Sequence, residues 1–140
     1  GTQNVAGAVG MATAMELAAQ DRPRFRADVT EARRRFEAKL IGVAERTVPE
    51  EISLVQHSHL RFAHHPSETL LVNLDLEGVA ASAGSACQSG ATQTSHVLKA
   101  MGMADEEAQR CLRFSFGWNT TADEADAAAE IVIAACEQRR

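Results

Sequence analysis

The chain has 140 residues, of which 45% are hydrophobic and 24% are charged, so it can fold as one domain with its own hydrophobic core. Its net charge of −5 argues against direct binding of nucleic acid or of an anionic membrane, because both need a basic surface. No apolar run approaches the roughly 18 to 20 residues of a membrane-spanning helix. The first residues do not read as a signal peptide, which predicts a cytoplasmic protein, and the lack of an initiator Met predicts a processed or truncated chain.

The N-terminal third of the chain is predicted to form two helices. Apolar residues recur at helical intervals over residues 5–19 and again over about 25–46. Residues 21–23 separate the two runs, and Pro23 suits the first turn of the second helix. Three consecutive arginines, residues 33–35, fall in the second run. They are either a solvated helix face, which is the commoner case, or a docking patch for an acidic partner.

The middle of the chain predicts short strands and one well-bounded helix. Residues 52–55 and 60–62 alternate apolar and polar side chains, which is typical of strands. Ser67 is expected to cap a helix that ends at Gly78. Residues 79–82 are predicted to form one more short strand.

The C-terminal part predicts two short helices, a strand and a long helix. Helical turns are expected over residues 95–101, closed by Gly102, and over 105–109. Residues 112–116 alternate apolar and polar side chains as in a half-buried strand. Residues 121–124 form a capping box that opens a long C-terminal helix. The whole pattern predicts an α/β fold of α+β-like character, with a short sheet packed against helices.

One stretch is poor in bulky side chains: Ser82-Ala83-Gly84-Ser85-Ala86-Cys87-Gln88-Ser89-Gly90. Glycines three residues before and three residues after Cys87 let a loop move, and the small neighbours leave its sulfur accessible. Cys87 is therefore a candidate sulfur nucleophile on a mobile loop, and a loop cysteine without a role is the alternative. Cys111 and Cys136 are expected to be packing residues, and the wide cysteine spacing predicts free thiols.

Arg113 lies on the polar face of its predicted strand, between Leu112 and Phe114. If buried it needs an anionic partner such as a carboxylate, and surface placement is the alternative. His57 and His59 stand two residues apart, which puts both on one face of a strand, but without a carboxylate or thiolate at a defined spacing. We therefore expect no metal site.

Several motifs follow one another in an order typical of one enzyme family. They are residues 82–90, Ser-His-Val-Leu-Lys-Ala-Met-Gly at 95–102, Leu-Arg-Phe-Ser-Phe-Gly at 112–117, and Thr120-Thr121. Together they closely resemble the C-terminal part of NifS-type cysteine desulfurases, class-V aminotransferases that use pyridoxal 5'-phosphate (PLP). The opening Gly1-Thr2-Gln3-Asn4 resembles a family segment that follows the cofactor lysine. The resemblance implies the fold of the C-terminal small domain of fold-type-I PLP enzymes.

The resemblance also implies an activity and a set of roles. Such enzymes convert L-cysteine to L-alanine and leave a persulfide on the cysteine that matches Cys87. Arg113 matches the arginine that holds the substrate carboxylate. Thr2 matches a threonine that reaches the PLP phosphate of the other subunit in a homodimer. The sulfur then passes to a sulfur-acceptor protein, as in iron–sulfur cluster biogenesis, tRNA thiolation or DNA modification.

The chain lacks the lysine that holds PLP in such enzymes. Its two lysines, Lys39 and Lys99, do not stand in the family's Ser-x-His-Lys context. We therefore expect residues 1–24 to be a helix that connects to an absent cofactor domain, and residues 25–140 to be the C-terminal small domain that carries the cysteine loop. The chain alone is expected to be inactive. Two alternatives stay open: a stand-alone sulfur-carrier or interaction module without catalysis, and a selenocysteine lyase.

Overall fold

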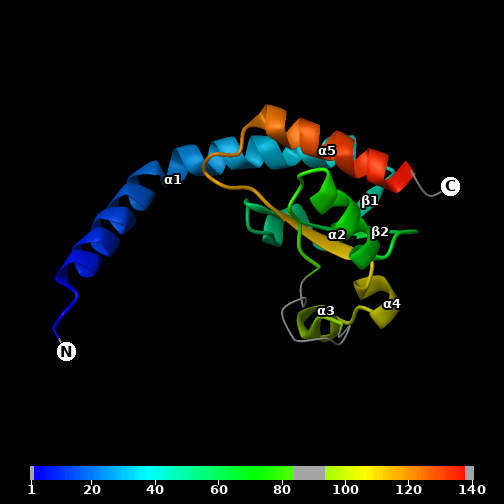
Figure 1. Cartoon of the computed structure of the whole chain (residues 1–140), viewed down its shortest axis with the longest axis horizontal. Helices are drawn as coiled ribbons and strands as arrows, with labels where there is room; N and C mark the ends of the chain where they lie inside the picture. Colours follow the sequence, from blue (N-terminus) through cyan, green and yellow to red (C-terminus); the bar gives the residue numbers. More distant parts are fainter. Residues whose placement is uncertain (1, 84–93, 138–140) are drawn as a thin grey trace.

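The computed structural model describes residues 2–83 and 94–137 (Figure 1). The described elements, in chain order, are helix α1 (Val5–Lys39), strand β1 (Ala44–Arg46), the 3-10 turn η1 (Glu50–Ile52), strand β2 (His57–Phe62), helix α2 (Ser67–Leu76), helix α3 (His96–Ala100), helix α4 (Asp105–Ala108), strand β3 (Cys111–Ser115) and helix α5 (Ala122–Glu137). The three strands form one antiparallel sheet in the order β1-β2-β3. The predicted fold class, a short sheet packed against helices, is confirmed. None of the helices within these two ranges is both long and apolar enough to span a membrane.

The sheet divides its side chains between two faces. Along β2, Ser58, Leu60 and Phe62 are buried, whereas the residues between them are only partly buried. In the register with β3, Leu60 faces Leu112 and Ser58 faces Phe114. The buried side chains of the two strands therefore share one face, because successive side chains of a strand alternate. Strand β3 shows the predicted alternation of apolar and polar residues from its second residue onward.

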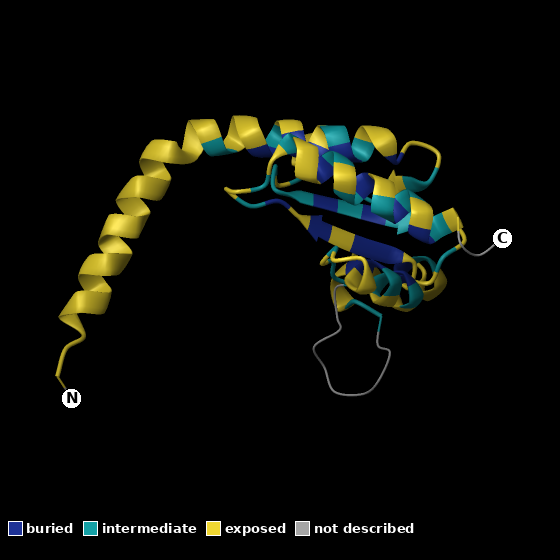
Figure 2. Cartoon of the chain, turned by 45° about the horizontal axis from the view of Figure 1, so that its top comes forward, coloured by how far each residue is buried: buried dark blue, intermediate teal, exposed yellow. Residues whose placement is uncertain are grey.

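Two helices cover the apolar face of the sheet. The C-terminal half of α1 and the whole of α5 lie side by side on it (Figures 1 and 2). Phe36 of α1 is 1% exposed, and its ring centroid lies 4.8 Å from that of Phe114 and 5.5 Å from that of Phe116. These ring contacts join the first helix to the strand that carries Arg113. The core thus fixes the strand from the side opposite to its polar face.

Helix α1 is continuous, and the predicted break at residues 21–23 is wrong. Pro23 lies inside the helix and removes one backbone N–H donor, but the neighbouring turns keep theirs. The helix bends instead of ending, between its first half and the part that lies on the sheet (Figure 1). At its start, Asn4 caps the helix by accepting a 2.9 Å hydrogen bond from the backbone N–H of Gly7. Every residue from 2 to 24 is exposed, so this half packs against none of the described residues (Figure 2).

One predicted helix boundary and one predicted strand in the first half of the chain are wrong. The helix ends at Lys39 and not near residue 46, because Gly42 adopts a left-handed φ of 85° and the chain turns into β1. Residues 52–55 do not form a strand. Ile52 belongs to η1 and is 76% exposed, so the apolar alternation there does not mark a buried face.

The boundaries around α2 are close to the prediction. The helix ends just before Gly78, whose φ of 81° suits the predicted C-terminal glycine. Ser67 is the first helical residue and not its cap; Pro66 occupies the cap position and no side chain caps the helix. Residues 79–82 make only an isolated bridge to β3, not the strand that their sequence predicted.

The C-terminal helices confirm the prediction. Helices α3 and α4 lie within the predicted segments, and Gly102 has a left-handed φ of 83° after α3. The capping box before α5 is formed in both directions. The backbone N–H of Thr121 donates to the Glu124 carboxylate at 2.8 Å, and the backbone N–H of Glu124 donates to Thr121 Oγ1 at 3.2 Å.

The arginine triplet is a solvated face only in part, because Arg33 is buried whereas Arg34 is exposed, and all three arginines pair with acidic residues of the domain. Arg33 is 1% exposed, and its guanidinium donates to Glu50 at 2.5 Å. Arg34 donates to the same carboxylate at 3.0 Å, and Arg35 pairs with Asp126 of α5. All three arginines therefore fasten α1 to the rest of the domain. The sequence pattern missed this because the acidic partners lie 16, 17 and 91 positions away.

Candidate functional site

The polar face of the sheet brings together the histidines and the arginine singled out in the sequence. His59 of β2 lies opposite Arg113 of β3, and His57 lies opposite Ser115. Because these residues alternate with the core residues of the same strands, they point away from α1 and α5. The prediction that His57 and His59 share one face is confirmed. Their pairing with β3 follows from the strand register.

A cavity of about 280 Å³ lies between this face and α3. The polar and sulfur-containing side chains that line it are Thr47, His59, Ser95, His96, Met101 and Arg113. Among the described residues, no aspartate or glutamate lines it. The described lining therefore contains a permanent cation, Arg113, and no carboxylate to offset its charge.

Arg113 is an exposed side chain, so surface placement is the correct one of the two predicted alternatives. Within the described ranges, no carboxylate lies at ion-pair distance from its guanidinium. A guanidinium has five N–H donors in a planar fork that matches the two oxygens of a carboxylate. Arg113 can therefore bind a carboxylate that comes from outside the chain.

The segment with Cys87 begins and ends at this site. On the incoming side, Ser82 and Arg113 form an antiparallel bridge with N···O distances of 3.0 and 2.7 Å. On the outgoing side, Ser95 lines the cavity. Cys87 itself lies outside the described residues. The bridge fixes the start of the segment beside Arg113.

Hydrogen bonds hold the two imidazoles of this face. His59 Nδ1 lies 2.7 Å from Thr47 Oγ1, and His57 Nδ1 lies 3.1 Å from Ser115 Oγ. Burial, and after it the positive charge of Arg113, lowers the pKa of each histidine below its ordinary value. At pH 7 both imidazoles are therefore mostly neutral, so they add little positive charge beside Arg113.

The lowered pKa values of His57 and His59 predict a loss of stability in acid. Such a histidine binds more protons in the unfolded than in the folded chain, so the free energy of unfolding falls as the pH drops below about 6.5. We expect the urea midpoint to decrease from pH 7 to pH 5, and the decrease to be smaller when both residues are glutamine. The matched control replaces the loop pair His64 and His65 with glutamine. Equal pH profiles for the two double variants would contradict this prediction.

The two cysteines in the described part of the chain are poor nucleophiles. Cys111 is buried with Leu98 and Ala108, and burial raises the pKa of its thiol to about 11. Burial also raises the pKa of Cys136 on α5 to about 11. Both are free thiols, as predicted. Their packing excludes them as the sulfur nucleophile, which needs an accessible thiolate.

The structure does not bring Thr2 or either lysine to the cavity. Thr2 is exposed beside the N-terminus, which lies at the free end of α1, away from the sheet (Figure 1). Lys39 pairs with Glu130 and Lys99 with Asp105. The hydrogen bond to Glu130 raises the pKa of Lys39, whereas a lysine that holds PLP has to react as the free amine. The residues of this chain therefore do not fit the covalent attachment of PLP.

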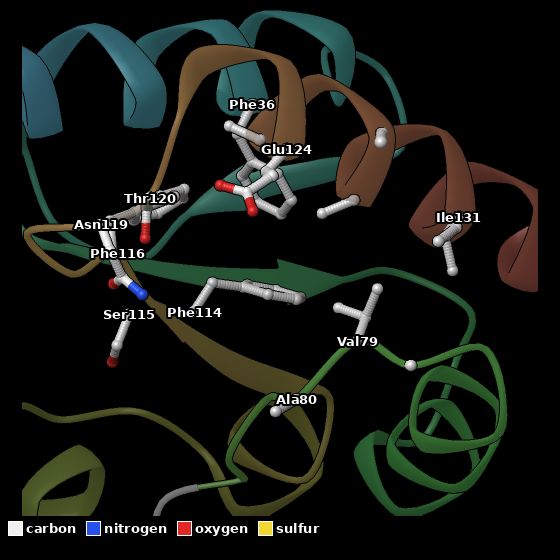
Figure 3. A pocket seen from close by; sticks show the side chains of 14 residues that line it. Phe36, Val79, Ala80, Phe114, Ser115, Phe116, Asn119, Thr120, Glu124 and Ile131 are labelled. Atoms are coloured by element: carbon white, nitrogen blue, oxygen red, sulfur yellow. The ribbon is translucent and has the colours of Figure 1, made fainter.

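A second cavity, of about 440 Å³, lies between α5, β3 and residues 78–80 (Figure 3). Its larger apolar side chains are Phe36, Val79, Phe114, Phe116 and Ile131, and its polar ones are Ser115, Asn119, Thr120 and Glu124. Its described lining contains no cysteine, histidine, lysine or arginine. The cavity beside Arg113 is the candidate site, because the arginine singled out in the sequence lines it and the Cys87 segment begins beside it.

Sequence reasoning missed two residues of the site. Thr47 lies just beyond the end of a predicted helix, and only the pairing of β1 with β2 brings it to His59. The backbone N–H of Thr47 donates to the carbonyl of His59 at 3.1 Å. His96 carries a sequence signal, because it belongs to the motif at residues 95–102.

Within the described ranges, no group of three or more histidine, cysteine, aspartate or glutamate side chains is placed so that it could hold a metal ion.

Comparison with known proteins identifies relatives of the chain. "Cysteine desulfurase IscS" of Dictyoglomus turgidum is 35% identical over 143 residues, which cover 100% of this chain and 36% of that protein. "IscS-like cysteine desulfurase" of Mycobacterium tuberculosis is 35% identical over 144 residues, covering 100% of this chain and 37% of that protein. A solved structure titled "NIFS-LIKE PROTEIN" matches with a TM-score of 0.80 and 31% identity, over 94% of this chain and 33% of the other.

Each of these matches covers most of this chain but only about a third of the related protein. A NifS-like protein from Rickettsia africae matches with a TM-score of 0.82 at 22% identity, over 96% of this chain and 35% of the other, and shows the same fold. The chain spans about a third of the length of these relatives. The sequence pattern of the family "Aminotransferase class-V" matches residues 1–128. The family expected from the motifs is confirmed: the chain belongs to the class-V aminotransferases.

Proposed function

We propose that this chain is the C-terminal domain of a PLP-dependent cysteine desulfurase. It supplies Arg113, which binds the carboxylate of L-cysteine, and Cys87, which accepts the sulfur. The observation that carries the proposal is the cavity beside Arg113. Among the described residues no carboxylate pairs with its guanidinium and no acidic side chain lines the cavity, and the start of the Cys87 segment is bridged to the same strand. The names of the relatives, which match over the whole chain, support the same activity.

Arg113 positions the substrate. Two of its N–H groups donate to the two oxygens of the α-carboxylate, which fixes the orientation of the amino acid as well as its place. The substrate thiol is then presented to a nucleophile on the adjoining segment.

Cys87 accepts the sulfur as a thiolate. It attacks the thiol sulfur of L-cysteine, an S–S bond forms and the Cβ–S bond breaks. The electron pair of the broken bond stays on Cβ, which takes up a proton, so the products are L-alanine and a persulfide on Cys87. Cys87 follows Ser82 by five residues, a length of chain that spans at most about 18 Å when fully extended. This length sets the upper limit on the distance between Cys87 and the bridge beside Arg113.

PLP, when bound, supplies the electron sink that makes the substrate sulfur electrophilic. Because neither lysine of this chain fits its attachment, PLP is held by a separate cofactor domain. Residues 1–24 connect to that domain, and residues 25–140 form the C-terminal small domain. The full exposure of the first half of α1 supports this division. Thr2 contacts the PLP phosphate of the other subunit in a homodimer.

The persulfide passes its outer sulfur to a sulfur-acceptor protein in the cytoplasm, as in iron–sulfur cluster biogenesis. A thiolate of the acceptor attacks the outer sulfur, and Cys87 leaves as a thiolate. The net charge of −5 supports a protein partner over nucleic acid or an anionic membrane.

Replacing Arg113 with alanine tests the proposal in the protein that joins this chain to its cofactor domain. A charge-assisted hydrogen bond contributes about 1.5–3 kcal/mol, so we expect the KM for L-cysteine to rise about 10- to 100-fold. The measurement is the rate of L-alanine formation against L-cysteine concentration. Arg113→Lys keeps the charge without the fork and is expected to lose less.

Arg110→Ala is the matched control for the Arg113 variant. Arg110 is exposed, lies outside the cavity beside Arg113 and donates to the carbonyl of Ala63. An unchanged KM in Arg113→Ala, or equal changes in both variants, would contradict the substrate-binding role. L-alanine formation by the isolated 140-residue chain with PLP would overturn the assignment of PLP to a separate domain. Turnover of selenocysteine, measured in parallel, separates a selenocysteine lyase from a desulfurase.

A further inference from the structure

We propose that His59 is a second carboxylate-binding group in the cavity beside Arg113, and that it takes up a proton when a carboxylate binds. The inference rests on the proposed function for the identity of the ligand, which is the α-carboxylate of an amino acid. It adds a proton-linked binding group to the site and makes substrate capture depend on pH.

The geometry places His59 where it can share a ligand with Arg113. The two residues are direct partners across β2 and β3, and they line the same cavity. Thr47 lies 2.7 Å from Nδ1 of His59, and its backbone N–H donates to the carbonyl of the same residue. The ring is thus held at Nδ1 and at its own backbone. Among the described residues, Nε2 has no hydrogen-bond partner, so it is the nitrogen that can meet a ligand in the cavity.

The charges around His59 explain why a bound carboxylate changes its protonation. From β3 it meets the cation Arg113, from α3 the titratable His96 lines the same cavity, and on its own strand the neighbouring same-face residues are His57 and Arg61. No aspartate or glutamate of the described residues lines the cavity to offset the cation. Without a bound anion, the positive charge of Arg113 therefore disfavours protonation of the His59 ring.

A bound carboxylate reverses this balance. Its negative charge offsets that of Arg113, and its oxygen accepts a hydrogen bond from Nε2–H of the charged ring. Protonation of His59 and binding of the carboxylate then favour each other, and by linkage each raises the affinity for the other by the same factor. Thr47 Oγ1 accepts a hydrogen bond from Nδ1–H, and its hydroxyl donates one to the carbonyl oxygen of His59 at 3.2 Å. Every donor of the imidazolium is satisfied in the complex.

The test uses the 140-residue chain and propionate, a carboxylate that carries no amino group. The Kd is measured by titration calorimetry at pH 6.0 and pH 8.0 at constant ionic strength, with chloride as the non-carboxylate anion. A rise of one unit in the pKa of a histidine corresponds to at most a tenfold change in Kd, so we expect binding about three- to tenfold tighter at pH 6.0. NMR titration of the His59 ring, with and without propionate, is expected to show its pKa rising on binding.

The variants separate this inference from the proposed function. His59→Gln keeps a donor near the position of Nε2 but cannot titrate, so binding should persist with Kd values within about twofold at the two pH values. His57→Gln is the matched control and should keep the wild-type pH dependence. Arg113→Gln should lose binding at both pH values. Circular dichroism of each variant confirms that it is folded, and the NMR pKa of wild-type His59 gives a readout that needs no substitution.

Two results would overturn these assignments in different ways. If propionate does not bind, or binds equally well to Arg113→Gln, the carboxylate site itself is wrong, and the proposed role of Arg113 fails together with that of His59. If binding needs Arg113 but has the same Kd at both pH values, or if the His59 pKa does not move, the role of His59 alone is wrong.

Discussion

Replacing Cys87 with serine is expected to abolish persulfide formation in the protein that joins this chain to its cofactor domain. The step forms an S–S bond, which serine cannot make, and a serine hydroxyl does not ionise near neutral pH. Binding of PLP and of L-cysteine should persist, because Arg113 and the cofactor domain are unchanged. The measurement is mass spectrometry after incubation with L-cysteine, which detects one added sulfur atom, together with the yield of L-alanine.

Cys136→Ala is the control for this experiment. Its thiol is half-buried on α5 with a pKa of about 11. Fewer than about one in a thousand such thiols is ionised at pH 7.5. We therefore expect this variant to form the persulfide at the wild-type rate. A persulfide on Cys111 or Cys136 in the Cys87→Ser protein, at normal yield, would overturn the assignment of the nucleophile.

Replacing Phe36 with alanine is expected to lower the free energy of unfolding by about 3–5 kcal/mol. Phe36 is 1% exposed, and its ring packs against Phe114 and Phe116, so the change leaves a cavity between α1 and β3. Domains of this size are typically stable by about 5–15 kcal/mol, so the loss is a large part of the total. Urea denaturation followed by circular dichroism measures it.

Phe25→Ala is the matched control for Phe36→Ala. Phe25 lies on the same helix but is only partly buried at the margin of the core, so its truncation should cost clearly less. Phe36→Leu keeps most of the buried volume and should fall between the two. Equal losses for Phe25→Ala and Phe36→Ala would mean that the ring cluster does not join α1 to β3. That cluster is what holds the back of the strand carrying Arg113.

Local sequence signals predicted several elements well. Gly78 and Gly102 mark helix ends because they adopt left-handed φ values that other residues avoid. The capping box of Thr121 and Glu124 works within one helical turn. Strand β3 alternates because one of its faces is buried. In each case the cause lies within a few residues of the feature, so it can be read from the chain.

Several predictions failed, and for the arginine triplet the cause is contacts with residues far away in the sequence. A break was expected at residues 21–23, with Pro23 in the first turn of a second helix, yet one helix continues through these residues with a bend. Ile52 suggested a strand, but no strand or helix among the described residues buries its side chain. The triplet that includes Arg33 looked like a solvated surface, but Glu50 and α5 provide its partners.

The same distinction holds for the candidate site. The sequence alone singled out Cys87 and Arg113 and determined the family, because short motifs in a fixed order carry that information. Only the tertiary structure decided what surrounds Arg113. Antiparallel register places His59 opposite it, β1 brings Thr47 to that histidine, and the Ser82 bridge fixes the start of the cysteine segment beside it. Strand register depends on packing across the whole sheet, which no local pattern encodes.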